Sequence, residues 1–480
     1  MAHAAQPGAT DRPAGQPQTI HELRERGYRP RTVKQELRRN LMGRLQRDDT
    51  LFPGIIGFEE TVVPQIENAI LSGQDIIFLG ERGQAKTRLA RTLVSLLDEW
   101  VPFIAGCEIN DEPLAPICAR CRALVADQGD DVPVDWLPRD RRYGEKLATP
   151  DITIADLIGE VDPIKVAEGR YLSDELTIHY GLLARTHRGI FVINELPDLA
   201  ERIQVGLLNI MEERDVQIRG YKIRLPLDLF VIASANPEDY TNRGRIITPL
   251  KDRFGSQIRT HYPRSVEHEM HIMEQERGLF SDSGEEYDTV VPSYMREIVA
   301  EVTHVARKSS DISQRSGVSV RVSVANYENL LSSALKRAIR LQERQVAPRI
   351  SDLLAIGQST GGKIELETLG DRDEEKVIDK LVQKAIVNVF NRHFALHEFD
   401  ELIANFENGL KVEVGDNLPS LEYVRQAAEV GGFTPAIKKL GGQGNPAVIA
   451  SDIEFVLEGL HLNRKLNKDR ASGHMRYRAS

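Results

Sequence analysis

Cysteine, tryptophan and long apolar segments are scarce in this sequence. Three cysteines in 480 residues cannot build a disulfide framework, so a small disulfide-stabilised secreted scaffold is excluded. No apolar run approaches the roughly 18 residues needed to span a bilayer. The first residues, MAHAAQPGATDRPAGQ, also lack the apolar segment of a signal peptide. These absences predict a cytoplasmic protein without a membrane span.

An excess of basic residues is also lacking. The chain has 62 Lys and Arg residues against 72 Asp and Glu residues, a formal net charge of −10. This balance argues against a general nucleic-acid binder, and we expect no specific nucleic-acid partner. With 41% hydrophobic and 28% charged residues, the composition is typical of a globular protein, and the length allows two or three domains.

One stretch, residues 75–92, reads DIIFLGERGQAKTRLART and orders a short apolar strand, a glycine-rich turn and a helix. This order matches the phosphate-binding loop template, except that Ala85 stands where the template has its last glycine. The glycines would let backbone N–H groups converge on a polyphosphate, and the helix N-terminus would add its positive end. Lys86 would reach the terminal phosphates and Thr87 would ligate magnesium. The predicted nucleotide-binding residues are Gly80, Glu81, Arg82, Gly83, Gln84, Ala85, Lys86, Thr87 and Arg88.

Two further apolar strands are expected at residues 190–193 and 229–233, and each ends in polar side chains. Because the carboxyl ends of parallel strands meet at one edge of a doubly wound sheet, these side chains are expected beside the loop. Glu195 could then polarise a water for attack on a γ-phosphate, and Asn236 could meet that phosphate. The simpler alternatives are an ordinary strand-to-helix turn at the loop and a solvated acid at Glu195. Strands that alternate with helices at this spacing predict an α/β fold with a parallel sheet.

All three cysteines lie in an interruption of the regular pattern at residues 101–150. Cys118 and Cys121 form a CxxC pair, the spacing that lets two thiolates share one zinc ion. Cys107 would be a third ligand, and the only visible fourth ligands are neighbouring acids such as Glu108. The alternative is three reduced cysteines that pack without binding a metal.

From residue 265 onward the pattern is helical, with a strong apolar stripe at 377–390. A Gly/Pro-rich stretch at 431–447 is expected to be a linker or loop, and the mildly basic tail after Asn463 is expected to be frayed. The expected segments are a disordered tail and helical arm at 1–50, a nucleotide-binding core at 51–264 with the insertion at 101–150, a helical segment at 265–345 and a helical C-terminal region at 346–480.

Taken in order, these motifs resemble the AAA+ ATPases of the magnesium-chelatase subunit I and MoxR group. The resemblance extends over about Phe52 to Leu341. GERG at 80–83 is similar to the chelatase form of the loop, and AKT at 85–87 is similar to the MoxR form. Four further segments are similar to family motifs: GLLARTHRGIFVINE leading into the Walker B strand, SANPED as sensor 1, LKDRFG around the arginine finger and GVSVR as sensor 2.

The resemblance implies an AAA+ core with a parallel sheet flanked by helices and β-hairpin insertions. An α-helical lid at 265–345 and the helical C-terminal region would follow. The resemblance assigns sensor 1 to Asn236, the arginine finger to Arg253 and sensor 2, on the lid, to Arg321. The two hairpin insertions are expected at 159–180 and around Arg219-Gly220.

The resemblance also implies an ATPase that uses ATP and Mg²⁺. The family's Walker B motif ends in Asp-Glu, whereas this chain has Asn194-Glu195, so Asn194 would orient a magnesium-bound water without supplying charge. If Arg253 completes a neighbour's site, the active unit is a ring, and the resemblance implies that this ring is a homohexamer. The motor would remodel a partner protein, by resemblance one with a von Willebrand factor A domain. The alternatives are the motor subunit of an authentic magnesium chelatase, which inserts magnesium into protoporphyrin IX, and a nucleotide-switched binding module with little turnover.

Overall fold

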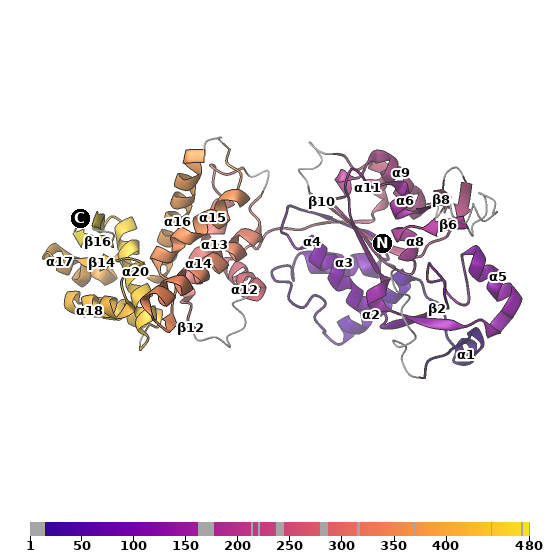
Figure 1. The fold of residues 1–480 in the computed structure, drawn as a ribbon, viewed down its shortest axis with the longest axis horizontal. Coiled ribbons are helices and arrows are strands. Elements are labelled where there is room, and N and C mark those ends of the chain that lie inside the picture. Colours follow the sequence, from indigo (N-terminus) through magenta and orange to yellow (C-terminus); the bar gives the residue numbers. More distant parts are fainter. Residues whose placement is uncertain are drawn as a thin grey trace. The chain divides into compact units, whose positions relative to one another are not determined.

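The computed structural model divides into two compact units, Met1–His261 and Tyr262–Ser480, drawn as ribbons in Figure 1. Each unit is described by itself. Of the tail expected to be disordered, residues 1–18, the first fourteen lie outside the described residues, as does the Arg219-Gly220 turn. The structure describes residues 15–161, 177–212, 215–218, 221–236, 244–278, 287–313, 317–367, 371–442, 444–471 and 474–479.

The first unit is built around a five-stranded parallel sheet with the strand order β11-β1-β10-β7-β4. The expected α/β fold with a parallel sheet is therefore confirmed. The first core strand, β1, is second in the order, between β11 and β10, so the loop that follows it opens beside the carboxyl ends of both neighbouring strands. The strands are β1 (Ile76–Leu79), β4 (Tyr143–Leu147), β7 (Gly189–Asn194), β10 (Leu229–Ala235) and β11 (Ser256–Arg259).

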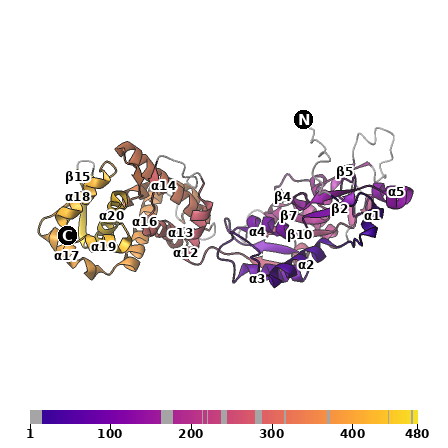
Figure 2. The same ribbon diagram turned by 90° about the horizontal axis from the view of Figure 1, so that it is seen from below.

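Helices cover both faces of this sheet (Figures 1 and 2). Successive side chains of a strand point to opposite faces, so Ile76 and Phe78 pack into one apolar cluster while Ile77 packs into another. Burial on both faces explains why the central strands read as continuous apolar runs. The helices of the first face are α2 (Val33–Gln46), α3 (Val62–Leu71) and α4 (Lys86–Thr92), and those of the second are α8 (Leu182–Arg185), α9 (Glu201–Glu212) and α11 (Thr248–Arg253).

The insertion expected at 101–150 is shorter than the sequence suggested. Strands β2 (Trp100–Ile104) and β3 (Val134–Pro138) pair antiparallel, and α5 (Ala119–Gln128) lies between them in the chain. Strand β4, however, belongs to the central sheet and pairs with β7. It escaped recognition because an edge strand has only one paired neighbour and is less buried, so its sequence YGEKL lacks a continuous apolar run.

Hairpin strands occur where the sequence analysis expected insertions. β5 (Gly159–Val161) pairs antiparallel with β6 (Ile178–Tyr180), and β8 (Asp215–Ile218) pairs antiparallel with β9 (Tyr221–Arg224). Between β5 and β6, residues 162–176 lie outside the described part of the chain, and only Thr177 is described. The remaining helices of this unit are α1 (Ile20–Glu25) and α6 (Ile154–Leu157).

The second unit is mainly helical and has one dominant apolar core. That core contains side chains of the expected lid, 265–345, and of the C-terminal region, 346–480. The two segments therefore share one core. Helix α20 is buried along almost its whole length, and its buried residues include three acids, Asp452, Glu454 and Glu458. The helices are α12 (Val266–Glu276), α13 (Ser293–Ala306), α14 (Val320–Leu341), α15 (Gly357–Thr360), α16 (Asp371–His393), α17 (Asp400–Glu407), α18 (Ser420–Val430), α19 (Thr434–Leu440) and α20 (Pro446–Leu462).

Two expectations for the C-terminal region were wrong. The stretch expected to be a linker contains α19, whose leucine and isoleucine pack against the core. The tail expected to be frayed forms a hairpin that adds to β14 in a three-stranded antiparallel sheet with the order β14-β16-β15. The strands of this unit are β12 (Asp288–Thr289), β13 (Gln345–Val346), β14 (Val412–Val414), β15 (Leu466–Ala471) and β16 (His474–Ala479).

No helix within the described ranges combines the length and apolar character required to cross a bilayer.

Candidate functional site

The loop after β1 has the backbone of a tight double turn. Gly83 has φ 75°, and Ala85 has φ 55° and ψ 15°, which is the left-handed region. Gly80 is required for a different reason: a Cβ there would lie 2.0 Å from Thr260 Oγ1. The loop therefore passes close to the end of β11 and contains two left-handed residues, the kind of backbone from which anion-binding loops are built.

Gln84 holds this loop in shape from inside. Its buried Oε1 accepts hydrogen bonds from the Glu81 N–H at 3.1 Å and from Thr260 Oγ1 at 2.7 Å. The Gln84 side chain therefore stabilises the loop conformation and its contact with the end of β11. Arg82 and Arg88, predicted beside it as nucleotide-binding residues, are exposed.

Lys86 is buried, with 8% of its surface exposed. Its Nζ donates to the carbonyl oxygens of Gly80 and Glu81, the latter at 2.9 Å, and to Asn236 Oδ1 at 2.7 Å. Asn236 follows β10, so this lysine connects the loop to the end of the neighbouring strand. The structure brings together two residues that lie 150 positions apart in the sequence.

The ends of β7 and β10 carry a hydrogen-bond network that continues from Lys86. Asn236 Nδ2 donates to Glu195 Oε2 at 2.9 Å. Thr87 Oγ1 and Ser234 Oγ both donate to Asn194 Oδ1, at 3.4 and 3.2 Å. The Glu195 backbone is left-handed, with φ 56°, which turns the chain sharply at the strand end. The predicted residues Lys86, Thr87, Asn194, Glu195 and Asn236 therefore form one site.

Glu145 on β4 belongs to this site and was missed by the sequence analysis. Its Oε1 accepts from Asn194 Nδ2 at 2.7 Å, and its Oε2 accepts from Arg91 Nε at 2.8 Å and Tyr143 Oη at 2.9 Å. Burial acts to raise the pKa of Glu145, but the hydrogen bonds from Arg91 and Tyr143 outweigh it and lower that pKa below its ordinary value. The sequence signal was weak because β4 was not recognised as a core strand, and a mid-strand acid has no motif.

Arg253 lies at the opposite edge of the sheet from the loop. Its Nη2 donates to the Met211 carbonyl oxygen at 2.7 Å, and its exposed side chain lines a cavity of about 290 Å³ with Asp75 and Gly255. Those two residues directly precede β1 and β11. The four residues of β1 span roughly 13 Å, so Arg253 is separated from the loop of its own chain by at least that length.

Arg321 belongs to the second unit and is described only within it. It is exposed in the first turn of α14, where its backbone N–H donates to Ser319 Oγ at 3.2 Å. Ser319 is the N-cap of that helix, so the GVSVR segment forms a helix start.

The three cysteines form a buried cluster with an acid that the sequence analysis did not identify. The ligand atoms of Cys107, Asp111, Cys118 and Cys121 all lie within 4.8 Å of one another, and the three cysteines are free thiols. Glu108, the acid suggested by proximity in sequence, is exposed. The fourth group is therefore Asp111, which is fully buried.

Acidic groups crowd one another in this cluster. Hydrogen bonds from the thiols of Cys118 and Cys121 lower the pKa of Cys107 to about 4. Burial, together with the neighbouring Cys118, raises the pKa of Asp111 to about 7. The two shifts have opposite directions because hydrogen bonds stabilise the charged form of Cys107, whereas loss of solvent destabilises the charged form of Asp111.

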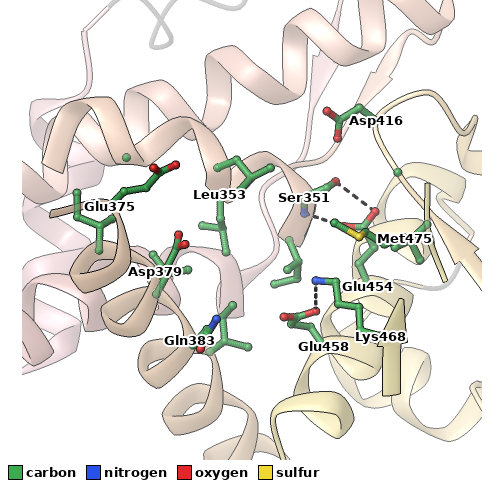
Figure 3. Close-up of a pocket in the computed structure, with 18 of the residues that line it drawn as sticks. Ser351, Leu353, Glu375, Asp379, Gln383, Asp416, Glu454, Glu458, Lys468 and Met475 are labelled. Carbon is green, nitrogen blue, oxygen red and sulfur yellow. Dashed lines mark hydrogen bonds and ion pairs between the residues drawn. The ribbon is translucent and has the colours of Figure 1, made fainter. Parts of the chain in front are cut away.

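A second cavity, of about 860 Å³, lies in the second unit between α16 and the β15–β16 hairpin (Figure 3). Glu454 accepts from the Ser351 N–H at 2.8 Å and Glu458 accepts from Lys468 Nζ at 2.7 Å. These two acids of α20 therefore serve to hold neighbouring elements against the buried helix. The sequence-predicted site residues are absent from the lining of this cavity.

The sequence has relatives among curated proteins, although no protein-family model matches it. It is 26% identical over 209 residues to the magnesium-chelatase 38 kDa subunit of Acidiphilium rubrum, which covers 41% of this chain and 54% of that protein. It is 25% identical over 287 residues to the chloroplastic magnesium-chelatase subunit ChlI of Glycine max, which covers 58% of this chain and 64% of that protein. The chain thus spans between about half and two thirds of the length of these relatives.

The structure was also compared with solved structures. A chain from a model of the complex between subunits BchI and BchD of magnesium chelatase aligns with a TM-score of 0.36 and 20% sequence identity. That alignment covers 68% of this chain and 98% of the other.

Proposed function

Because this chain is a relative of the magnesium-chelatase subunit I and MoxR group of AAA+ ATPases, we propose that it binds ATP with Mg²⁺ at the loop of residues 80–88 and hydrolyses it. The main support is the continuous hydrogen-bond path from Lys86 through Asn236 to Glu195, with steps of 2.7 and 2.9 Å. A lysine, an amide and a carboxylate converge there at the carboxyl edge of three parallel strands. These are the groups that transfer of a phosphoryl group to water requires.

The residues of the loop would hold the nucleotide. Lys86 Nζ is bonded to loop carbonyl oxygens and to Asn236, and it would exchange these acceptors for phosphate oxygens, which are stronger ones. Thr87 would ligate Mg²⁺ directly, and Asn194 would do so through a water. When bound, Mg²⁺ would neutralise charge that develops on the phosphates.

Glu195 would act as the base that orients and activates the attacking water. Its carboxylate accepts from Asn236 Nδ2 at 2.9 Å, which fixes its position next to the lysine. Asn236 contacts both Lys86 and Glu195, so it would report the presence of the γ-phosphate to the base. This is a reason for the sensor role that the family resemblance implies.

Glu145 would supply the negative charge that Asn194 lacks. Asn194 stands where the family has an aspartate, and its amide donates to Glu145 at 2.7 Å. A carboxylate on the adjacent strand would therefore lie next to the residue that holds the magnesium-bound water. Hydrolysis would not then require an aspartate at position 194.

Steady-state release of phosphate, with and without Mg²⁺, tests this proposal. Lys86→Ala should abolish nucleotide binding, because it removes the cation that meets the phosphates. Glu195→Gln should keep binding and lower turnover by about 10²-fold or more, the usual contribution of a general base. Glu201→Gln, an exposed acid at the start of α9, is the matched control. If turnover is unchanged in Glu195→Gln, Glu195 is not the base.

The ATPase would work in the cytoplasm as a homohexamer that remodels a partner protein, one with a von Willebrand factor A domain. Arg253 lies away from the loop of its own chain, which favours action on a neighbour's site. Arg321 would couple the nucleotide state to movement of the helices that carry it. Sedimentation with ATP and Mg²⁺ should show hexamers; monomers alone would contradict the ring.

Two alternative functions give different results in simple assays. A motor subunit of an authentic magnesium chelatase would support formation of Mg-protoporphyrin IX when it is reconstituted with chelatase partner subunits, whereas a motor of MoxR type would not. A nucleotide-switched binding module would bind ATP but release almost no phosphate, even with its partner present. The replacement of aspartate by Asn194 is the feature that favours the module.

A further inference from the structure

We propose that Cys107, Asp111, Cys118 and Cys121 form a structural zinc site. The four ligand atoms, which come from a segment of fifteen residues, lie within 4.8 Å of one another. In a tetrahedral site with Zn–S bonds of about 2.3 Å, neighbouring sulfurs are separated by roughly 3.8 Å. The cluster therefore needs only a small contraction to surround an ion.

Backbone amides already hold these side chains in place. The Asp111 N–H donates to Cys107 Sγ at 3.3 Å, and the Cys121 N–H donates to Cys118 Sγ at 3.3 Å. Such bonds stabilise thiolates and orient the ligands, as outer-shell partners of metal sites do. The Cys118 side chain also caps α5, so the CxxC pair is carried by the rigid start of a helix.

Asp111 provides an independent indication of a ligand. Its Oδ2 accepts from the Cys118 N–H at 3.0 Å, but its Oδ1 is buried and accepts no hydrogen bond from the residues that the structure describes. Asp111 itself has no exposed surface. A buried carboxylate oxygen without a partner is costly, and a cation among three thiols would satisfy it.

The burial of the cluster indicates a structural role. Cys107 is the most exposed of the four residues, with 8% of its surface accessible. Four protein ligands also leave no open coordination position for a substrate. Catalytic zinc sites instead keep one position for water. The ion would connect the turn after β2 to the start of α5, two points that lie in the otherwise irregular segment between Ile104 and Ala119.

The segment that zinc would organise also receives the N-terminal arm. The Val134 N–H donates to the Gln18 carbonyl oxygen at 2.7 Å, and Trp136 Nε1 donates to that of Pro17 at 2.9 Å. Ile20 of α1 packs into the same apolar cluster as the three cysteines. Loss of the metal is therefore expected to loosen the arm together with the insertion.

Metal analysis of the purified full-length chain tests the site. Protein expressed with zinc in the medium should contain about one zinc per chain, and Co²⁺ in its place should show the strong thiolate charge-transfer and tetrahedral absorption bands. Cys121→Ser should lose the metal, and Asp111→Asn should bind it at least tenfold more weakly. Glu108→Gln, an exposed acid beside Cys107, is the matched control and should bind as the wild type does.

The wild-type protein alone can overturn the proposal, so a variant that misfolds does not obscure the result. If reduced wild-type protein contains no zinc and takes up neither Zn²⁺ nor Co²⁺, the cluster is a set of packed thiols. If Glu108→Gln weakens binding as much as Asp111→Asn does, Asp111 is not the fourth ligand. Faster proteolysis between residues 15 and 138 after chelation, with zinc restoring protection, would support the structural role.

Discussion

Ala85 and Asn194 each replace the residue that their motif normally has, and the structure gives each a different physical setting. Ala85 adopts the left-handed backbone that the template glycine provides, at a cost of about 1–2 kcal/mol for a residue with a side chain. Asn194 keeps the position of the usual acid but donates its amide to Glu145. The first replacement costs some stability, whereas the second places an amide beside a carboxylate of a neighbouring strand.

A charge swap at residue scale tests the pairing of Asn194 with Glu145. Glu145→Gln should lower Mg²⁺-dependent turnover about tenfold, or about 1.4 kcal/mol in the barrier, because no carboxylate then remains beside the magnesium position. Asn194→Asp alone should not raise activity, since two carboxylates would face each other 2.7 Å apart. The double variant, which exchanges amide and acid, should recover most of the loss. Equal activity of Glu145→Gln and wild type would remove Glu145 from the site.

At the scale of elements, polar side chains join helices and strands inside both units. In the first unit, Arg142, just before β4, is buried against Glu36 of α2 with two hydrogen bonds of 2.7 and 2.6 Å. Glu36 also accepts from the Asp98 N–H. One buried ion pair thus holds the edge strand that carries Glu145 to the helix layer.

Breaking this pair should destabilise the first unit selectively. Glu36→Gln should cost about 3 kcal/mol or more, because it leaves the Arg142 cation buried without a counter-charge. The chain's two tryptophans, Trp100 and Trp136, both lie in this unit, so tryptophan fluorescence during denaturation will report its unfolding. Disrupting the exposed Arg47–Asp49 pair should cost under about 1 kcal/mol.

The corresponding control replaces both partners. Glu36→Met combined with Arg142→Leu should recover much of the stability, since apolar side chains of similar size remove the unpaired charge. If the single and double variants are equally unstable, the pair acts through shape and not through charge.

In the second unit, Asp452 makes the stability of α20 dependent on pH. Asp452 is fully buried, Tyr294 Oη donates to its Oδ1 at 3.0 Å, and its Oδ2 has no hydrogen-bond partner among the described residues. Burial raises the pKa of Asp452 to about 7. The folded state therefore retains a proton that the unfolded chain releases near pH 4.

This raised pKa predicts that stability falls as pH rises. Between about pH 4 and 7 the folded state binds more protons than the unfolded state, so the free energy of unfolding decreases through that window and levels off above it. The contribution is at most about 4 kcal/mol at about 1.4 kcal/mol per pKa unit. Asp452→Asn should remove this slope and raise the melting temperature above pH 7, as followed by circular dichroism. The exposed Asp416→Asn should leave the slope in place.

At the scale of the whole molecule, the position of Arg253 bears on the proposed assembly. Arg253 lies at the amino ends of the strands, and the loop lies at their carboxyl ends. Within a single chain, the arginine therefore does not reach the loop. A head-to-tail ring brings one subunit's edge to the next subunit's loop. The separation of Arg253 from its own loop therefore supports a ring, whereas the number of six subunits comes from the family resemblance alone.

Mixing two inactive variants tests this arrangement. Arg253→Ala should keep nucleotide binding and lose turnover by about 10³-fold or more, and Lys86→Ala should lose binding. In an equimolar mixture, about a quarter of the interfaces would pair an intact loop with an intact arginine, so activity should reappear. No recovery, despite mixed hexamers in native mass spectrometry, would exclude action of Arg253 on a neighbouring subunit.

Several parts of this protein could be predicted from local sequence alone. The strands β1, β7 and β10 are continuous apolar runs because helices cover both of their faces. β4 could not be recognised, since its half-buried residues have no such pattern. The tail hairpin was missed for a similar reason: its polar residues alternate with few apolar ones, and its pairing with β14 lies about 60 residues away in the chain.

The sequence by itself determined the phosphate-loop motif, the polar residues that follow each core strand, and the order of motifs that resembles the magnesium-chelatase subunit I and MoxR group. These signals are local, because each depends on residue types at short spacing. Only the tertiary structure decided which distant groups meet: Glu145 with Asn194, Asp111 with the cysteines, and Arg253 away from its own loop. The physical reason is that sheet order and burial, which no short segment encodes, set the distances between charged groups.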